Sequence, residues 1–314
     1  MKLTSKAWLT CLKAAVTAGL TALILLQINF RSVVPVMREG AYWLLIPAAV
    51  LWYAAVLCGA LRWRGILAHY GIRIRRSESF SLYWIGTFFN NFLPSSMGGD
   101  SYKFLLLKRR HAGTSWQRIL SSIIIDRGVG FLAMLLLSSA LAPAYLPALP
   151  FGPTFGAFLA AAGLLLALAS LAVLASPKML FSLREPRNRA VASLIRLINA
   201  LGSFADARAL ALALAYSGLF LLLQTAFYQL CFLTFGHPVP FPILLFIVPL
   251  LSIAEIFPFA LNSIGVREGA GVVLFGCFGV PPAISLSALI MLRLVGTVGG
   301  ATGGVPFMLQ RRAR

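Results

Sequence analysis

Six apolar runs, each long enough to cross a bilayer, constrain this chain more than any other feature. A hydrocarbon core about 30 Å thick needs roughly 20 apolar residues in a helix. The runs are bounded by charge or by Gly and Pro, and cover approximately residues 7–28, 41–61, 117–141, 153–175, 209–235 and 283–309. No small-residue cleavage site precedes Arg31, so we interpret the first run as a retained span rather than a signal peptide. The sequence therefore predicts an all-α integral membrane protein.

The composition fits the same class. Apolar residues make up 60% of the chain and charged residues 11%, whereas a typical soluble domain carries about 25% charged residues. The net charge of +19 would suggest nucleic-acid binding in a soluble chain, but here the basic residues flank the apolar runs, so we expect no nucleic-acid partner. The isolated histidines and cysteines, and the absence of nucleophile and phosphate-loop motifs, predict no catalytic residues, no metal, no cofactor and no enzyme activity.

Most of the 27 Lys and Arg residues lie in alternate loops. They cluster before the first run, after the second, before the third, between the fourth and fifth, and after the last. The positive-inside rule therefore predicts that both termini are cytoplasmic. Arg127, Arg267 and Arg293 lie within apolar segments, so topology does not explain them.

Two further apolar stretches, residues 79–107 and 241–280, do not fit as single spans. The charge pattern requires each to begin and end on one side of the membrane, and each is interrupted by Pro, polar residues, Gly and an acid. We therefore expect about six full spans plus two re-entrant helical hairpins, in one domain over 1–314. The order of two spans, a hairpin and a span occurs twice in opposite orientation, predicting inverted halves at about 1–148 and 149–314. The alternative, in which residues 241–261 form a full span, stays open.

Both hairpin breaks predict irregular backbone that lines a cavity, because unsatisfied amides are very costly in hydrocarbon. We expect the helix to restart with Asp100 or Ser101 as its N-cap in the first hairpin, and near Arg267 after Gly265 in the second. Free N–H groups at a helix start favour an anion such as a lipid phosphate. The predicted substrate-binding residues are Asn91, Pro94, Gly98, Gly99, Asp100, Lys103, Asn262, Gly265, Arg267 and Glu268.

Structural pairing is the alternative role for these charges. Lys103 could pair with Asp100, and Arg267 with Glu268 or Glu255. Each ionisable residue inside a span costs at least about 2.5 kcal/mol on insertion scales, and so needs a partner or a wet cavity. Salt bridges that fix helix packing and carboxylates that carry protons are both consistent with the sequence, and Glu255 and Glu268 are the candidate partners of Arg293. The predicted charged network consists of Asp126, Arg127, Glu255 and Arg293, together with Glu268.

Three separated motifs resemble the lysylphosphatidylglycerol synthase transmembrane region, also called the flippase-like domain family. They are Asn91-Phe92-Leu93-Pro94 followed by Gly98-Gly99-Asp100, the pair Asp126-Arg127, and Asn262-x-x-Gly265-Val266-Arg267-Glu268. Asp126 departs from the pattern, where Glu is the usual acid. The resemblance implies a multi-pass protein of a bacterial cytoplasmic (inner) membrane that moves lipid between leaflets. Because the chain stops at Arg314, we expect no synthase activity.

The function predicted from the sequence is a flippase that moves a phosphate-bearing lipid, phospho- or polyprenyl-linked, through a midplane site between the two hairpins. The alternative is a non-transporting scaffold for a lipid-modifying enzyme or glycosyltransferase. The Arg-rich segment 178–208, with Arg184, Arg187 and Arg189, would be its docking surface. A membrane enzyme using Asp100 or Glu268 as acid or base is a third option, but it lacks a recognisable nucleophile.

Overall fold

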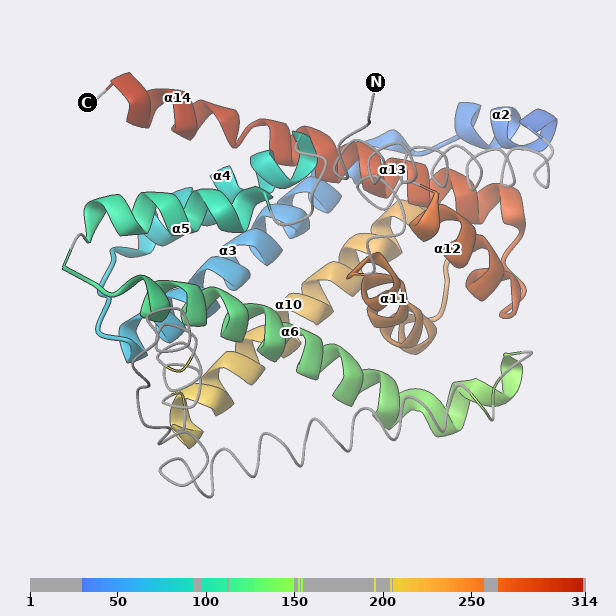
Figure 1. Cartoon of the computed structure of the whole chain (residues 1–314). Coiled ribbons are helices and arrows are strands. Elements are labelled where there is room, and N and C mark those ends of the chain that lie inside the picture. Colours follow the sequence, from blue (N-terminus) through green and yellow to red (C-terminus); the bar gives the residue numbers. More distant parts are fainter. Residues whose placement is uncertain are drawn as a thin grey trace, which may run out of the picture.

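The computed structural model is helical throughout the part of the chain that it describes, with no strand there. It describes residues 30–92, 98–111, 113–149, 206–256 and 265–312, together with residues 152, 154, 195 and 204. The helices, labelled in Figure 1, are α2 (Phe30–Arg38), η1 (Tyr42–Leu44), α3 (Leu45–His69), α4 (Arg76–Phe92), α5 (Gly98–Arg110), α6 (Trp116–Tyr145), η2 (Leu146–Ala148), α10 (Ala207–Leu233), α11 (Phe241–Ile256), α12 (Val266–Gly276), α13 (Pro282–Ala301) and α14 (Gly304–Arg312).

Four stretches are long and apolar enough to cross a membrane: Tyr42–His69, Trp116–Ala148, Ala207–Leu233 and Pro282–Leu309. They confirm four of the six predicted spans, and the predicted spans 7–28 and 153–175 lie outside the described residues. Two boundaries were wrong, because α3 continues past Leu61 to His69 and α6 continues past Leu141 to Tyr145. The buried face of α3 continues through Trp63, Ile66 and Leu67, at helical spacing, into the second half of the helix.

Two helix pairs, α4 with α5 and α11 with α12, contact each other on either side of the predicted breaks. The breaks, including Pro94 and Asn262, lie outside the described residues. In the first pair α5 already begins at Gly98, so the prediction of Asp100 or Ser101 as N-cap was wrong. Instead, the Asn90 side chain accepts a hydrogen bond from the Gly99 N–H at 2.7 Å, which satisfies one free donor of the first turn.

The second pair restarts where the sequence predicted. Helix α12 begins at Val266 after Gly265, whose φ of 84° lies in the left-handed region that glycine adopts readily. The carboxylate of Glu268 reaches back and accepts a hydrogen bond from the Gly265 N–H at 2.9 Å. The start of α12 is therefore capped from within its own first turn.

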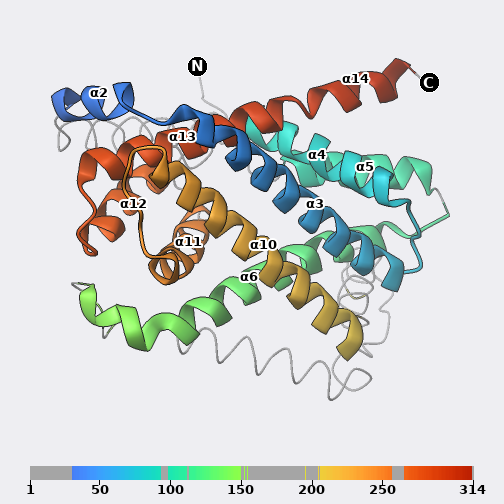
Figure 2. The same cartoon turned by 180° about the vertical axis from the view of Figure 1, so that it is seen from behind.

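Helices α3 and α10 lie side by side and antiparallel across the middle of the molecule (Figures 1 and 2). At one end the N–H of Ala41 donates to the carbonyl of Thr234 at 2.7 Å. At the other end Nδ1 of His69 lies 3.9 Å from a carboxylate oxygen of Asp206. The two long helices are thus joined near both of their ends.

The other contacts follow the same pattern in two sets of helices, α3–α6 and α10–α13. Helix α4 packs on α3 and α5, and α5 packs on α6, just as α11 packs on α10 and α12, and α12 packs on α13. Each helix pair also contacts the last long helix of the other set, α4 against α13 and α11 against α6. Exchanging α3–α6 for α10–α13 therefore reproduces the set of contacts.

Each of these two sets of helices has its own apolar core. One core gathers large side chains from α3, α4, α5 and α6, including Trp63, Leu82, Leu107 and Ile119. The other lies mainly among α10, α11, α12 and α13, with Phe232, Phe246, Phe275 and Leu289. The hydrophobic surface buried in each core holds its hairpin against the long helices.

The close approach of α4 to α5 generates a first prediction. A Cβ on Gly99 would overlap the backbone carbonyl of Gly86, which cannot move aside as a side chain can. We expect Gly99→Ala to lower the free energy of unfolding by about 1–3 kcal/mol, as overpacking does, measured by thermal unfolding of the purified protein in detergent. Gly128→Ala, on α6 with no atom within 4 Å of its Cβ position, is the matched control and should not destabilise the protein. Equal melting temperatures for the two variants would contradict the packing argument.

Candidate functional site

Asp100 lies at the centre of the first group of buried charges. Its side chain, 7% exposed, forms an ion pair with the Lys103 ammonium, whose Nζ lies 2.7 Å from one carboxylate oxygen. Its other oxygen accepts from Nε and Nη2 of Arg127, both at 2.9 Å. Asp100 and Lys103 are in the first two turns of α5 and Arg127 is in the middle of α6, so one carboxylate joins these two helices.

The Lys103 ammonium has aromatic neighbours as well as its carboxylate. Its Nζ lies 4.5 Å from the ring centre of Tyr83 on α4 and 4.8 Å from that of Trp63 on α3. A cation over an aromatic face is attracted by the electrons of the ring, more strongly where water is excluded. The side chain of Lys103 is 5% exposed, and the residue lies in α5, the restarted helix of the stretch 79–107 in which the sequence placed it.

Asp126 pairs with a different helix from its neighbour Arg127. Nε of Arg62 on α3 donates to Asp126 at 2.7 Å, and Nη1 of Arg62 donates to Ser217 of α10 at 2.9 Å. Successive residues of a helix point about 100° apart, so Asp126 faces α3 while Arg127 faces α5. Arg62 is the first of the cations that follow the second apolar run, which the positive-inside rule predicted to be cytoplasmic, but its side chain is 8% exposed and lies in the core.

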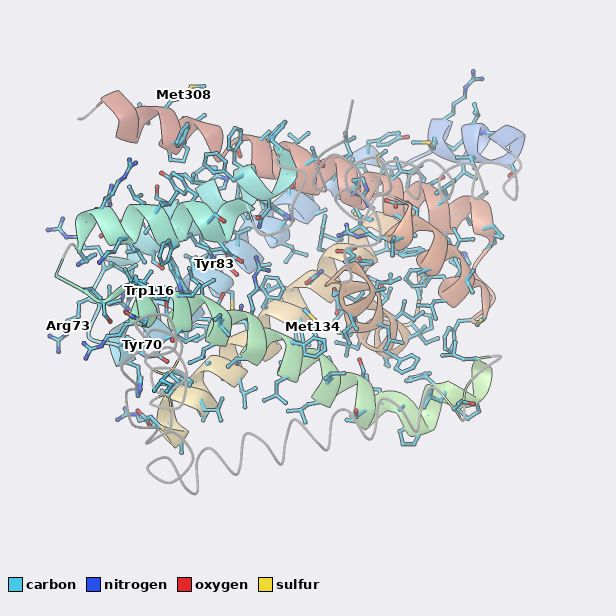
Figure 3. The ribbon with its side chains drawn as sticks, viewed as in Figure 1. Tyr70, Arg73, Tyr83, Trp116, Met134 and Met308 are labelled. Atoms are coloured by element: carbon cyan, nitrogen blue, oxygen red, sulfur yellow. The ribbon has the colours of Figure 1, made fainter. Side chains whose placement is uncertain are left out.

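We call Arg62, Asp100, Lys103, Asp126 and Arg127 the first ion-pair cluster. Figure 3 shows Tyr83, which interacts electrostatically with both acids and both arginines, between α5 and α6 in that view. The cluster holds three cations and two acids. Arg127 is its accessible member, with 54% of its side chain exposed. The cluster therefore carries one excess positive charge, and the guanidinium of its member Arg127 is accessible.

A second ion-pair cluster joins α11, α12 and α13. Arg267 binds Glu255 through two nitrogens, with Nη2 2.7 Å from Oε2. Arg293 donates to both oxygens of Glu268, at 2.6 and 3.2 Å. With two arginines and two glutamates, this cluster is balanced in charge. Glu268 was one of the two partners predicted for Arg293, and Glu255 one of the two predicted for Arg267.

The two clusters correspond in position. Asp100 is the third residue of α5 and Glu268 the third residue of α12. Arg127 and Arg293, which pair with these acids, are each the twelfth residue of the long helix that follows. The same salt bridge thus links the second helix of a hairpin to the next long helix in both halves.

The remaining predicted residues have mainly packing contacts. The Asn91 amide donates to the carbonyls of Gly296 and Thr297 on α13, at 3.4 and 3.3 Å. Gly98 and Gly99 form the buried first turn of α5. Asn90, Trp63 and Tyr83 were not singled out from the sequence; for Trp63, its place on the continuing apolar face of α3 is the available signal.

Within the described ranges, no three His, Cys, Asp or Glu side chains come close enough together to hold a metal ion. Each of the four acids in the two clusters contacts Arg or Lys instead. These contacts use the oxygens that a bound cation would need. The clusters thus suit an anion that replaces a carboxylate better than they suit a metal.

Two comparisons with known proteins found similar sequences. The family model described as "Lysylphosphatidylglycerol synthase TM region" matches residues 11–304, which include both clusters. The UPF0104 membrane protein PH1989 of Pyrococcus horikoshii (strain OT-3) is 26% identical over 98 residues, covering 31% of this chain and 29% of that protein. The matched segment is thus less than a third of that relative.

The Arg62–Asp126 pair generates a second prediction. Removing one partner of a buried pair leaves an uncompensated charge, which costs about 3–5 kcal/mol, whereas replacing both partners by apolar residues is often neutral. We therefore expect Arg62→Met to lower the melting temperature strongly and Arg62→Met with Asp126→Leu to recover most of the loss. Thermal unfolding of the single and double variants gives the coupling energy. Additive losses would show that the two side chains do not interact.

Proposed function

Because the chain belongs to the family of the lysylphosphatidylglycerol synthase transmembrane region, we propose that it is a lipid flippase that moves a phosphate-bearing lipid between the leaflets. The substrate class includes phospholipids and polyprenyl-linked lipids. The proposed path runs between the two helical hairpins, which enter the membrane from opposite sides. The charge pattern of the loops supports an orientation with both termini in the cytoplasm.

The observation that carries this proposal is the repeated salt bridge. Asp100–Arg127 and Glu268–Arg293 occupy corresponding positions in two sets of helices that make matching contacts. Such correspondence supports inverted halves, in which a substrate site lies where discontinuous helices meet. Two equivalent arginines would then offer a phosphate equivalent contacts from the two halves.

A phosphate is the ligand that the first ion-pair cluster favours. The two acids of the cluster leave one of its three positive charges without compensation, and Arg127 is exposed enough to meet a headgroup. Arg binds phosphate in a forked, charge-assisted geometry. A phosphate at Arg127 would compete with Asp100, and the contact that joins α5 to α6 would weaken as the lipid binds. Exchange of carboxylate for phosphate therefore couples binding to helix movement.

Lys103 and Arg267 take part in this proposal through the same exchange. Each has a carboxylate partner in the structure, Asp100 for Lys103 and Glu255 for Arg267. A headgroup reaches either cation only when that carboxylate is displaced. The N–H of Gly265 is likewise already bound by Glu268. The acids of the two clusters therefore act as internal competitors of the substrate.

Transport by reconstituted protein tests the proposal. In liposomes that contain fluorescent phosphatidylglycerol or a polyprenyl-phosphate probe, we expect the protein to accelerate movement of at least one headgroup over empty liposomes. Arg127→Gln and Arg293→Gln should each slow it by about tenfold or more, because each removes a charge-assisted contact worth about 1.5–3 kcal/mol. Arg73→Gln, a cation outside both clusters, is the matched control and should transport normally.

In a Lys103→Met background, in which no buried ammonium loses its carboxylate partner, the exchanged pair Asp100→Arg with Arg127→Asp separates binding from packing. It restores the salt bridge between α5 and α6, but it moves the guanidinium from α6 to α5. If Arg127 binds phosphate, the exchanged pair regains thermal stability without regaining transport. Full recovery of both properties would show that the salt bridge is structural only. No acceleration of either probe by the wild-type protein would refute the flippase.

A further inference from the structure

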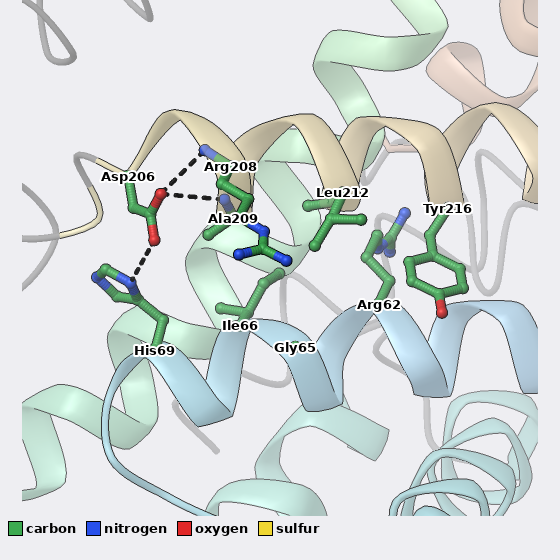
Figure 4. Close-up of a pocket in the computed structure, with 10 residues that line it drawn as sticks. Arg62, Gly65, Ile66, His69, Asp206, Arg208, Ala209, Leu212 and Tyr216 are labelled. Carbon is green, nitrogen blue, oxygen red and sulfur yellow. Dashed lines mark hydrogen bonds and ion pairs between the residues drawn. The ribbon is translucent and has the colours of Figure 1, made fainter.

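A cavity of about 220 Å³ lies between α3 and α10, at the end of these helices where His69 and Asp206 meet (Figure 4). Its walls are residues spaced three or four apart on each helix, so it runs along both axes. Gly65 leaves open space on the α3 side of this cavity, because a Cβ there would meet no atom within 4 Å. We name this cavity the α3–α10 furrow, lined by Arg62, Gly65, Ile66, His69, Arg208 and Leu212 among others.

The furrow is open to the surface of two membrane-length helices. Leu212 is 54% exposed and Gly65 is also exposed, although both lie within stretches apolar enough to span a bilayer. Surface of this kind faces lipid in a membrane. An unfilled furrow there would lose dispersion contacts along its whole length, whereas an acyl chain restores them. The apolar wall thus suits one lipid chain.

The mouth of the furrow is polar, with the guanidinium of Arg208, the imidazole of His69 and the carboxylate of Asp206. Asp206 uses its carboxylate to cap α10, accepting from the N–H groups of Arg208 and Ala209 at 2.9 and 3.3 Å. The start of α10 is therefore satisfied by its own residue, and an incoming anion would meet the guanidinium of Arg208 first, with the His69 imidazole, which contacts Asp206, beside it. An Arg beside an apolar groove at a helix end is placed for a headgroup phosphate.

The inner end of the furrow reaches the first ion-pair cluster. Arg62 lines the cavity and binds Asp126 on its other side. It lies seven residues before His69 on α3, about 10 Å deeper along the helix. The cavity is smaller than the roughly 300–1,000 Å³ of a site that encloses a whole ligand, so it holds part of one lipid and leaves the rest in the bilayer.

We propose that the α3–α10 furrow is the entry site for the transported lipid. It holds the headgroup phosphate of an anionic lipid at Arg208, beside His69, and one acyl chain along Gly65 and Leu212. Arg62 then forms the gate between this site and the first ion-pair cluster. This inference rests on the proposed function, since it names where the transported lipid first binds.

Native mass spectrometry of the full chain tests it, from micelles that contain phosphatidylglycerol and diacylglycerol with identical acyl chains. We expect the wild type to retain phosphatidylglycerol in preference to diacylglycerol. Gly65→Leu should reduce retention of phosphatidylglycerol about tenfold by filling the furrow, and Arg208→Gln should remove the preference over diacylglycerol. Gly218→Leu, the same change at an open position of α10 that does not line the furrow, and Arg73→Gln should behave as the wild type.

Wild-type retention by Gly65→Leu would overturn the furrow as the binding site. An unchanged preference in Arg208→Gln would overturn the phosphate contact. Because the measurement needs no transport, its failure is distinct from failure of the proposed function. Loss of retention in Gly65→Leu, together with no transport by the wild type, would leave a lipid site on a protein that is not a flippase.

Discussion

The salt bridge between the start of α5 and the middle of α6, formed by Asp100 and Arg127, fixes one hairpin against the long helix that follows it. Its counterpart, Glu268 with Arg293, fixes the other. Charges inside a membrane protein are costly unless paired, so neither contact can open without a replacement for the lost partner. The apolar cores pack the helices, but these two bridges decide where each hairpin meets its neighbour. A ligand that breaks either salt bridge must itself carry a charge, because it replaces the lost partner.

The helices of the structure were predictable where hydrophobicity alone determines them. Four membrane-length stretches and the restart of a helix after Gly265 follow from apolar length and from the freedom of glycine. The end of α3 was not predictable from charge. Arg62 follows an apolar run, as a loop cation would, and its burial depends on Asp126, which is distant in the sequence and adjacent in space. Counting charges cannot distinguish a buried arginine from a loop arginine, since both stand at the end of an apolar run.

The partners within the site were harder to predict than its members. The sequence left two candidate acids for Arg267 and two for Arg293, and the packing of α11, α12 and α13 selects one for each. The neighbours Asp126 and Arg127 look like a pair in the sequence, yet helical geometry directs them to different helices. Residue identity predicted which side chains need partners, whereas the choice of partner required the arrangement of the helices in space.

The sharing of Asp100 has a consequence for how freely the sequence can vary. The chain holds only 8 Asp and Glu residues against 27 Lys and Arg, and Asp100 serves two of those cations at once. Loss of Lys103 or Arg127 leaves this carboxylate with a remaining partner, but loss of the carboxylate strands two positive charges together. Tolerance to substitution is therefore unequal across the salt bridge. In a chain this rich in cations, the acid is the member that is hardest to replace.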